Sequence, residues 1–251
     1  MWQNFSNKFI ERKGWMGIVL PVWVIASFIL VQVVVSLLFI LADNLGLLGG
    51  INPAILSTVT GAVVYTLTLL MVIGLPMLVK NYRTTKKDVG LEKLPTWIDL
   101  LLAPAGFLVY IFLSAILILL ATQFFTFFDA DQVQDTGFNQ LGQGYEYLLA
   151  FVTLVIIAPV AEEILFRGYL FGKLMKHMPI WVAILITSAL FGLAHGAWNV
   201  GIDVFALSIV LCLLRLTSKS LWPAILLHMM KNGLAFYLLF INPTLLSTLG
   251  G

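Results

Sequence analysis

The feature that most constrains the fold is a series of apolar stretches of membrane-spanning length. We place them at residues 16–42, 54–79, 97–125, 147–176, 180–197, 202–216 and 221–240. A helix needs about 20 apolar residues to cross a bilayer. Inside hydrocarbon the backbone polar groups must be satisfied within the protein, which favours helices. The sequence therefore predicts an all-α fold, a polytopic transmembrane helical bundle of about seven spanning helices.

Composition supports this class and excludes others. The chain is 61% hydrophobic and 10% charged, whereas soluble domains are about 25% charged. The net charge of +2 gives no reason to expect a nucleic-acid partner. The single cysteine, Cys212, excludes an internal disulfide, and no CxxC or Cys/His metal-binding spacing is present.

Loop charges predict the orientation in the membrane. Residues 80–93 carry five Lys and Arg residues, and residues 129–146 carry four acids with no Lys or Arg. By the positive-inside rule, 80–93 is cytoplasmic, and the basic arm at 1–15 places the N-terminus on the same side. We expect a multi-pass protein of a prokaryotic plasma membrane, because no organelle signal is recognisable.

Polar residues are distributed unevenly between two parts of one bundle. Residues 1–146 supply three N-terminal helices with few ionisable groups, which we expect to serve as scaffold, lateral gate or docking surface. Residues 147–240 hold all three histidines, two adjacent acids and an intramembrane lysine. Ionisable residues in a membrane are costly and usually functional, so an active site is expected among the last four helices.

The adjacent acids Glu162 and Glu163 lie inside an apolar segment. Glu163 and Arg167 are four residues apart in the favourable order for a helical ion pair. This pairing would leave Glu162 directed elsewhere and available for chemistry, since neighbouring helical residues diverge by about 100°. Alternatively, both acids only neutralise Arg167. Pro159, one turn before the pair, predicts a kink.

Two further helices carry matching polar groups. His195 shares a helix face with Phe191, and its distance from the hairpin near His177 places it at the depth of Glu162. His228 and Asn232, four residues apart, share one face of the last helix. The alternative for these side chains is interhelical hydrogen bonding. Lys231 is expected to snorkel, to line a wet cavity or to pair with an acid.

A cluster of Glu162, Glu163, His195, His228 and Asn232 is suited to activating water. A partly buried carboxylate is a useful general base, and Asn and His can donate hydrogen bonds to an oxyanion. Zinc is the alternative, with Glu162, His195 and His228 as ligands from separate helices, because the chain has no HExxH motif. The chain contains no GxSxG motif, which disfavours a mechanism through an acyl-enzyme.

Three motifs on separate helices resemble those of the CPBP intramembrane proteases. They are EExxxR at 162–167, FxxxH at 191–195 and HxxxN at 228–232. This family includes the type II CAAX prenyl endopeptidases and bacterial Abi proteins linked to bacteriocin immunity. The resemblance covers about residues 147–237.

The resemblance implies a role for each motif residue. Glu162 would activate water, with Glu163, Arg167 and Phe191 in support, and His195 would assist the water or the leaving group. His228 and Asn232 would stabilise the oxyanion. The family is described as metalloproteases, so zinc is the implied cofactor if a metal takes part, and the implied substrate is a membrane-anchored peptide or protein.

Two other functions compete with an intramembrane endopeptidase. A non-enzymatic immunity or scaffold protein of the Abi type would keep the fold and bind a partner without cleaving it. A secondary transporter is disfavoured, because transporters usually have repeats that share a site between two halves, whereas here the polar groups lie in one half.

Overall fold

The computed structural model describes residues 15–80, 83–126, 128–129, 136–138 and 141–245. In these residues the secondary structure consists of helices, which are joined by turns and loops. Residues 1–14 of the basic arm, and residues 130–135 and 139–140 of the acidic loop, lie outside the described residues. The elements are α2 (Met16–Asn44), α3 (Pro53–Leu69), η1 (Leu70–Gly74), α4 (Leu75–Lys80), α5 (Lys86–Val89), α6 (Trp97–Phe124), α7 (Gly144–Phe151), η2 (Val152–Ile157), α8 (Ala158–Glu163), η3 (Ile164–Phe171), α9 (Gly172–Leu174), α10 (Ile180–Leu193), α11 (Trp198–Ser218), α12 (Trp222–Phe236) and η4 (Tyr237–Ile241).

Six helical segments are long and apolar enough to cross a membrane, which confirms the polytopic class. Within the described residues they are 16–44, 53–79, 97–124, 144–174, 198–218 and 222–241. The expected fifth span, α10, has only 14 residues, or about 21 Å at 1.5 Å per residue. It is therefore shorter than the roughly 30 Å of a hydrocarbon core.

Local sequence signals explain where several helices begin. Asn52 caps α3 by accepting a hydrogen bond from the Ala54 amide, and Pro53 occupies the first helical position. Thr96 and Asp99 form a capping box at the start of α6. These short polar devices satisfy backbone amides that would otherwise have no partner at the helix ends.

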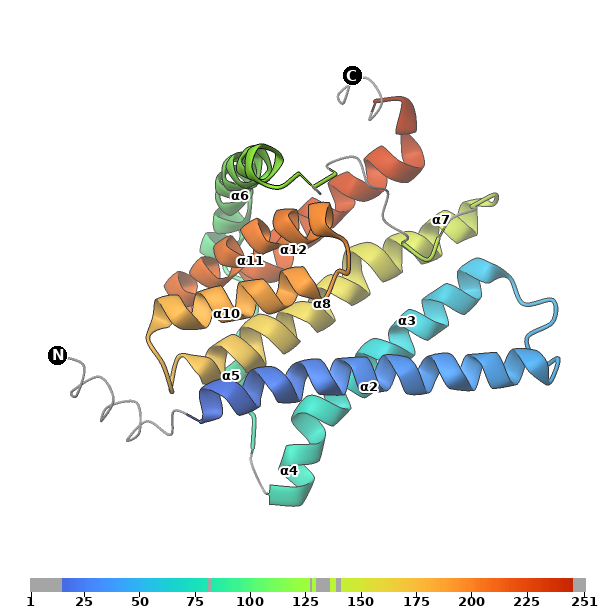
Figure 1. The fold of residues 1–251 in the computed structure, drawn as a ribbon, viewed down its shortest axis with the longest axis horizontal. Coiled ribbons are helices and arrows are strands. Elements are labelled where there is room, and N and C mark those ends of the chain that lie inside the picture. The colour runs from blue at the N-terminus through green and yellow to red at the C-terminus, as the bar shows by residue number, and fades with distance from the viewer. Residues whose placement is uncertain (1–14, 81–82, 127, 130–135, 139–140, 246–251) are drawn as a thin grey trace.

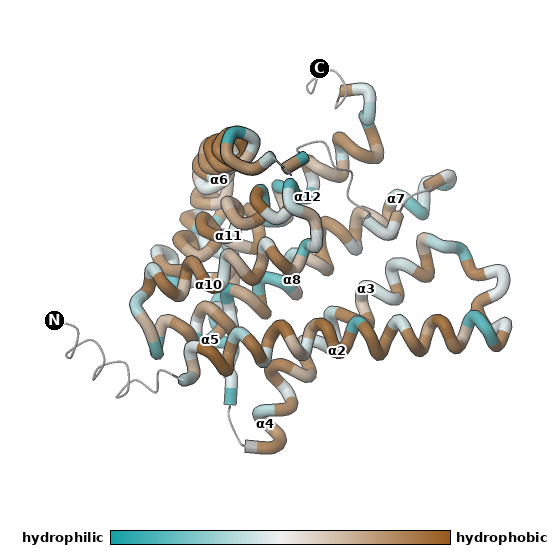
Figure 2. The backbone as a smooth tube through the Cα atoms, viewed as in Figure 1, coloured by the Kyte–Doolittle hydropathy of each residue, from teal (hydrophilic) through white to brown (hydrophobic). Residues whose placement is uncertain are grey.

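The helices of the C-terminal half form the packed centre of the bundle. Helix α11 packs between α10 and α6, and α12 packs against α6, α11 and the fourth span, 144–174. Helices α2 and α3 lie against each other and against the fourth span (Figure 1). Figure 2 shows hydrophobic residues along most of α2 and α6. Many of their large apolar side chains are exposed, as lipid-facing surfaces require.

The fourth span is a continuous helix that changes its hydrogen-bonding pattern. Two π-helical segments, η2 and η3, lie on either side of α8. Pro159 is the second residue of α8, directly after η2. Proline removes a backbone donor and clashes with the preceding turn, and π-helical turns are frequent at functional sites. The π-helical segment η2 thus lies directly before the turn that contains Pro159, the residue at which we predicted a kink.

The turn between the fifth and sixth helices differs from our prediction. We expected the fifth helix to extend to residue 197 and the sixth to begin at residue 202, whereas α10 ends at Leu193 and α11 already begins at Trp198. Gly196, with φ of 72°, adopts the left-handed conformation that closes the earlier turn. Consequently His195 lies in the turn and Asp203 lies inside a helix, where it faces other spans.

Candidate active site

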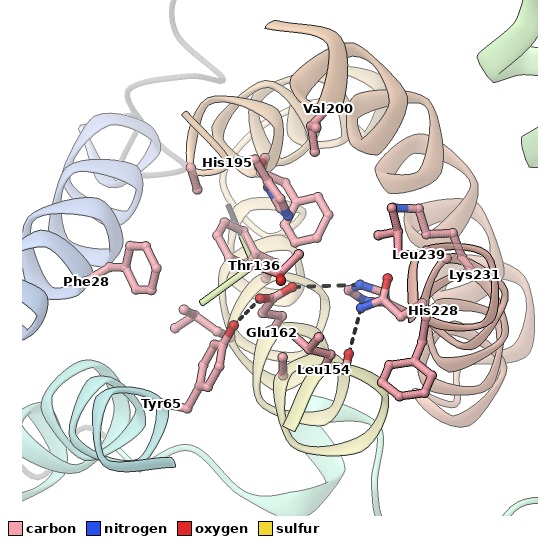
Figure 3. Close-up of a pocket in the computed structure, with 18 of the residues that line it drawn as sticks. Phe28, Tyr65, Thr136, Leu154, Glu162, His195, Val200, His228, Lys231 and Leu239 are labelled. Carbon is pink, nitrogen blue, oxygen red and sulfur yellow. Dashed lines mark hydrogen bonds and ion pairs between the residues drawn. The ribbon is translucent and has the colours of Figure 1, made fainter. Parts of the chain in front are cut away.

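A cavity of about 420 Å³ lies among the helices of the C-terminal half and α2 and α3. Figure 3 shows that polar side chains from separate helices meet there. Predicted site residues that line the cavity are Glu162, Phe191, His195, His228 and Asn232. Glu163 and Arg167 do not line it and are wholly buried behind it. The structure thus brings residues of all three motifs to one place, from the fourth span, from α10 with the turn after it, and from α12.

Glu162, on α8, presents its two carboxylate oxygens to different partners. Oε1 accepts a hydrogen bond of 2.5 Å from the hydroxyl of Tyr65. Oε2 lies 3.8 Å from Nε2 of His228, and the side chain is 15% exposed. Glu162 is therefore reachable from the cavity through Oε2.

Glu163 points away from the cavity into a buried ion pair. Its Oε1 lies 2.9 Å from Nη1 of Arg167, and both side chains have no exposed surface. The same oxygen lies 2.8 Å from Nδ1 of His228. The ion pair expected from the four-residue spacing is present, and it separates the two neighbouring acids: one faces the cavity and the other holds a histidine.

The tautomers of both histidines follow from their partners. Nδ1 of His195 lies 2.8 Å from the carbonyl oxygen of Phe191. Because a carbonyl oxygen only accepts, this nitrogen donates. Nδ1 of His228 donates to the Glu163 carboxylate in the same way. In the neutral state the Nε2 lone pair of each imidazole therefore remains available as an acceptor.

Phe191 holds these groups together by ring contacts. The Arg167 guanidinium lies 4.1 Å from the centre of its ring, a cation–π contact. The rings of His195 and His228 pack edge-on at centroid distances of 5.0 and 5.8 Å. Phe191 is fully buried, so its position fixes the spacing between the ion pair and both imidazoles.

Asn232 and Lys231 make contacts that tie α12 to other helices. Asn232 Nδ2 donates to the Leu154 carbonyl oxygen, in η2, at 2.9 Å. Only one of its two amide hydrogens is needed for that bond, so the other is available to a ligand. Lys231 Nζ lies 3.4 Å from Asp203 Oδ2, and Lys231 also lines the cavity, so two of the alternatives that we left open for this side chain hold together.

Asp203 in turn accepts hydrogen bonds from two hydroxyl groups of α6. Tyr110 and Ser114 donate to its Oδ1 at 2.7 and 2.6 Å. These hydrogen bonds offset the free-energy cost of holding a carboxylate inside a spanning helix. They also connect α6, α11 and α12 beside the cavity.

The side chains that face the cavity are of the types that bind metal ions, but in the described residues they are not clustered as the ligands of one ion would be. Histidine ligands usually donate their second nitrogen to a carboxylate or a carbonyl, as His228 and His195 do. In the described part of the chain, however, no three His, Cys, Asp or Glu side chains are arranged to hold an ion.

Sequence reasoning missed two residues that contact the site. Tyr65 belongs to one of the helices that we expected to serve as scaffold, lateral gate or docking surface, and Asp203 was not among the candidate residues. A signal for Tyr65 existed: it lies midway along the span 53–79, whereas membrane tyrosines are enriched at the interfaces. For Asp203, the glycine at 196 marked the true turn.

The fold and the site define a class: a polytopic helical membrane protein with a carboxylate–imidazole site in its spanning helices. Comparison with known proteins agrees with the motifs. Residues 144–234 match the sequence model of the type II CAAX prenyl endopeptidase Rce1-like family. The family resemblance inferred from the three motifs is therefore confirmed over this segment. The match includes every predicted site residue and excludes α2, α3 and α6.

Individual relatives match over similar segments. YdiL of Bacillus subtilis (strain 168) is 31% identical over 84 residues, 34% of each chain. The membrane-embedded CAAX protease MroQ of Staphylococcus aureus (strain USA300) is 29% identical over 94 residues, 35% of this chain and 38% of the relative. A 24.3 kDa protein of Escherichia coli is 32% identical over 89 residues, 34% of this chain and 41% of the relative. The matches thus span between about a third and two fifths of these relatives. No solved structure matches the chain.

Proposed function

We propose that the protein is an intramembrane endopeptidase that hydrolyses a peptide bond of a membrane-associated peptide or protein. The observation that carries this proposal is the cavity in which Glu162, His195 and His228 meet, with the carboxylate of Glu163 behind His228. The family match over residues 144–234 and the name of MroQ support the reaction class.

In the proposed reaction, Glu162 acts as the general base. Oε2 takes a proton from a water in the cavity, and the water oxygen attacks the carbonyl carbon of the peptide. His195, with Nδ1 donating to Phe191, accepts a hydrogen bond from this water through Nε2 and orients it. The protonated Glu162 then gives its proton to the leaving nitrogen as the C–N bond breaks.

His228 and Asn232 would stabilise the oxyanion. In its doubly protonated form, His228 keeps Nδ1 on the Glu163 carboxylate, 2.8 Å away, and presents Nε2 as a second donor. Asn232 supplies its second amide hydrogen. Preorganised donors of this kind act strongly in a site shielded from water.

The test uses the purified protein in detergent with a library of membrane-anchored and lipidated peptides, read by mass spectrometry. We expect wild type to cleave a subset and Glu162→Gln to cleave none, while folding normally. Glu92→Gln removes a carboxylate that lines a different pocket and should retain full activity. Zinc content, measured on the same samples and on His195→Ala, shows whether a metal is bound.

The opposite result favours a non-enzymatic protein. If Glu162→Gln still cleaves, the assignment of the base is wrong. If wild type cleaves nothing and Glu162→Gln fully restores a cellular phenotype of a deletion strain, the protein acts by binding, as in the Abi-type alternative. We further propose that the N-terminus and the loop 80–93 are cytoplasmic, which site-directed labelling of single cysteines would check.

A further inference from the structure

Tyr65, on α3, makes a hydrogen bond to a predicted catalytic group, and it comes from outside the family-matched segment. Its hydroxyl donates to Glu162 Oε1 at 2.5 Å. In Figure 3, Tyr65 projects from α3 toward Glu162, on the side of that residue away from His228. The two oxygens of the Glu162 carboxylate thus have separate environments.

This contact is the last of three polar links between the second and fourth spans. Asn52 donates to Glu146 at 2.6 Å, at the start of both spans. Thr153 donates to Thr58 at 3.3 Å, further along. The Tyr65–Glu162 bond follows at the level of the cavity. Together the links fix α3 alongside the fourth span from its first turn to the site.

The spacing of these links involves the π-helical segment η2. Between the second and third links α3 advances from residue 58 to 65, while the fourth span advances from 153 to 162. The fourth span therefore uses nine residues where α3 uses seven. A π-helix closes its hydrogen bonds over one residue more than an α-helix, and η2 (Val152–Ile157) occupies this interval. A π-helical segment of this kind takes up about one extra residue, so η2 contributes to bringing Glu162 to the level of Tyr65.

We propose that Tyr65 is a positioning residue of the active site, which holds Glu162 by Oε1 so that Oε2 faces the water and the substrate. This inference rests on the proposed function. A glutamate side chain on a cavity wall has several rotamers, and fixing one of them before reaction avoids an entropic cost at the transition state. The second span is then part of the catalytic apparatus.

Tyr65→Phe removes only the hydroxyl, and Tyr147→Phe is its matched control. Tyr147 donates to the Leu141 carbonyl oxygen at 3.2 Å and does not line the cavity. We expect Tyr65→Phe to lower kcat by about 10- to 100-fold, with KM within about twofold and an unchanged unfolding temperature. Tyr147→Phe should retain wild-type kcat.

A double-mutant cycle separates positioning from a general packing effect. Glu162→Asp withdraws the carboxylate from the phenol by one methylene and already breaks the bond. If Tyr65 acts through Glu162, adding Tyr65→Phe to Glu162→Asp costs less than about twofold, because the two changes remove the same interaction. Independent effects would multiply, and that outcome would overturn the proposal.

A second measurement does not depend on knowing the substrate. A hydrophobic carbodiimide labels accessible carboxyl groups in membranes, and the labelled peptide is identified by mass spectrometry. Because the phenol covers Oε1, Tyr65→Phe should increase labelling of Glu162 severalfold, whereas Tyr147→Phe should not. Glu163, which is wholly buried, provides the internal control.

The outcomes distinguish this inference from the proposed function. If wild type and Glu162→Gln are equally inactive on every peptide, the proposed function fails, and the labelling result still decides whether Tyr65 covers Glu162. If wild type cleaves and Glu162→Gln does not, but Tyr65→Phe keeps wild-type kcat and labelling, only the role of Tyr65 is refuted.

Discussion

Arg167 Nη1 lies 2.9 Å from Glu163 Oε1, and neither side chain has any exposed surface. The neighbouring Glu162 lines the cavity instead. Two consecutive acids on one helix thus occupy two environments, because successive helical side chains point about 100° apart. The buried ion pair supports the histidine that faces the cavity-lining acid.

Removing Arg167 should destabilise the protein. Arg167→Met leaves the Glu163 carboxylate buried without its cation, and breaking one partner of a buried pair costs about 3–5 kcal/mol. Thermal unfolding in detergent measures the change. Lys176→Met is the control, because its ion pair with Asp88 spans 3.6 Å between side chains that are 64% and 38% exposed. Such a pair contributes at most about 1 kcal/mol. Equal unfolding temperatures for the two variants would contradict this prediction.

Replacing Asp203 should leave Lys231 without its acid partner beside the cavity. Asp203→Ala also removes the acceptor of two hydroxyl groups, so we expect a loss of about 3–5 kcal/mol in stability. Lys231→Met in the same chain should recover part of this loss, with a coupling of about 0.5–3 kcal/mol. Unfolding temperatures of the two single variants and the double variant give the coupling, and strictly additive losses would argue against a functional ion pair between these residues.

Adding a methyl group at Gly192 should force α10 and α11 apart. A Cβ there would lie 2.7 Å from the backbone oxygen of Gly201, which has little freedom to move. Gly192→Ala should therefore cost about 1–3 kcal/mol and reduce activity, since His195 follows in the next turn. Gly233→Ala meets only Val155 Cγ1 at 3.7 Å and should be neutral or slightly stabilising in its helix. If both variants unfold at the same temperature, the prediction that Gly192 has no room for a methyl group is wrong.

His228 should be more important for cleavage than the histidine at the hairpin tip. His228→Gln removes the ring that lies between Glu162 and Glu163, and we expect kcat to fall about 100-fold or more. His177→Gln lies outside the cavity lining and should leave kcat within about twofold. Steady-state cleavage of a peptide from the library measures kcat of both variants. If both lose kcat to a similar extent, the loss in His228→Gln reflects impaired folding and not the removal of a catalytic group.

Much of the fold follows from the sequence because membrane helices obey local rules. The apolar runs, the basic loop at 80–93 and the caps at Asn52 and Thr96 are all readable along the chain. The length of α10 was misjudged, because an apolar run continues past Leu193 into the turn. Gly196 has a positive φ and lies in the turn that follows the end of α10 at Leu193.

The buried ion pair could be predicted from the sequence, because Glu163 and Arg167 are joined by one helix whose repeat fixes their distance. The candidates Glu162, His195, His228 and Asn232 could also be identified, since polar groups in apolar spans are costly. The partners of these residues, by contrast, are known from the three-dimensional packing alone. Tyr65 and Glu162 are 97 residues apart, and Lys231 meets an acid from another helix. Such contacts depend on the packing and register of whole helices, which no local pattern specifies.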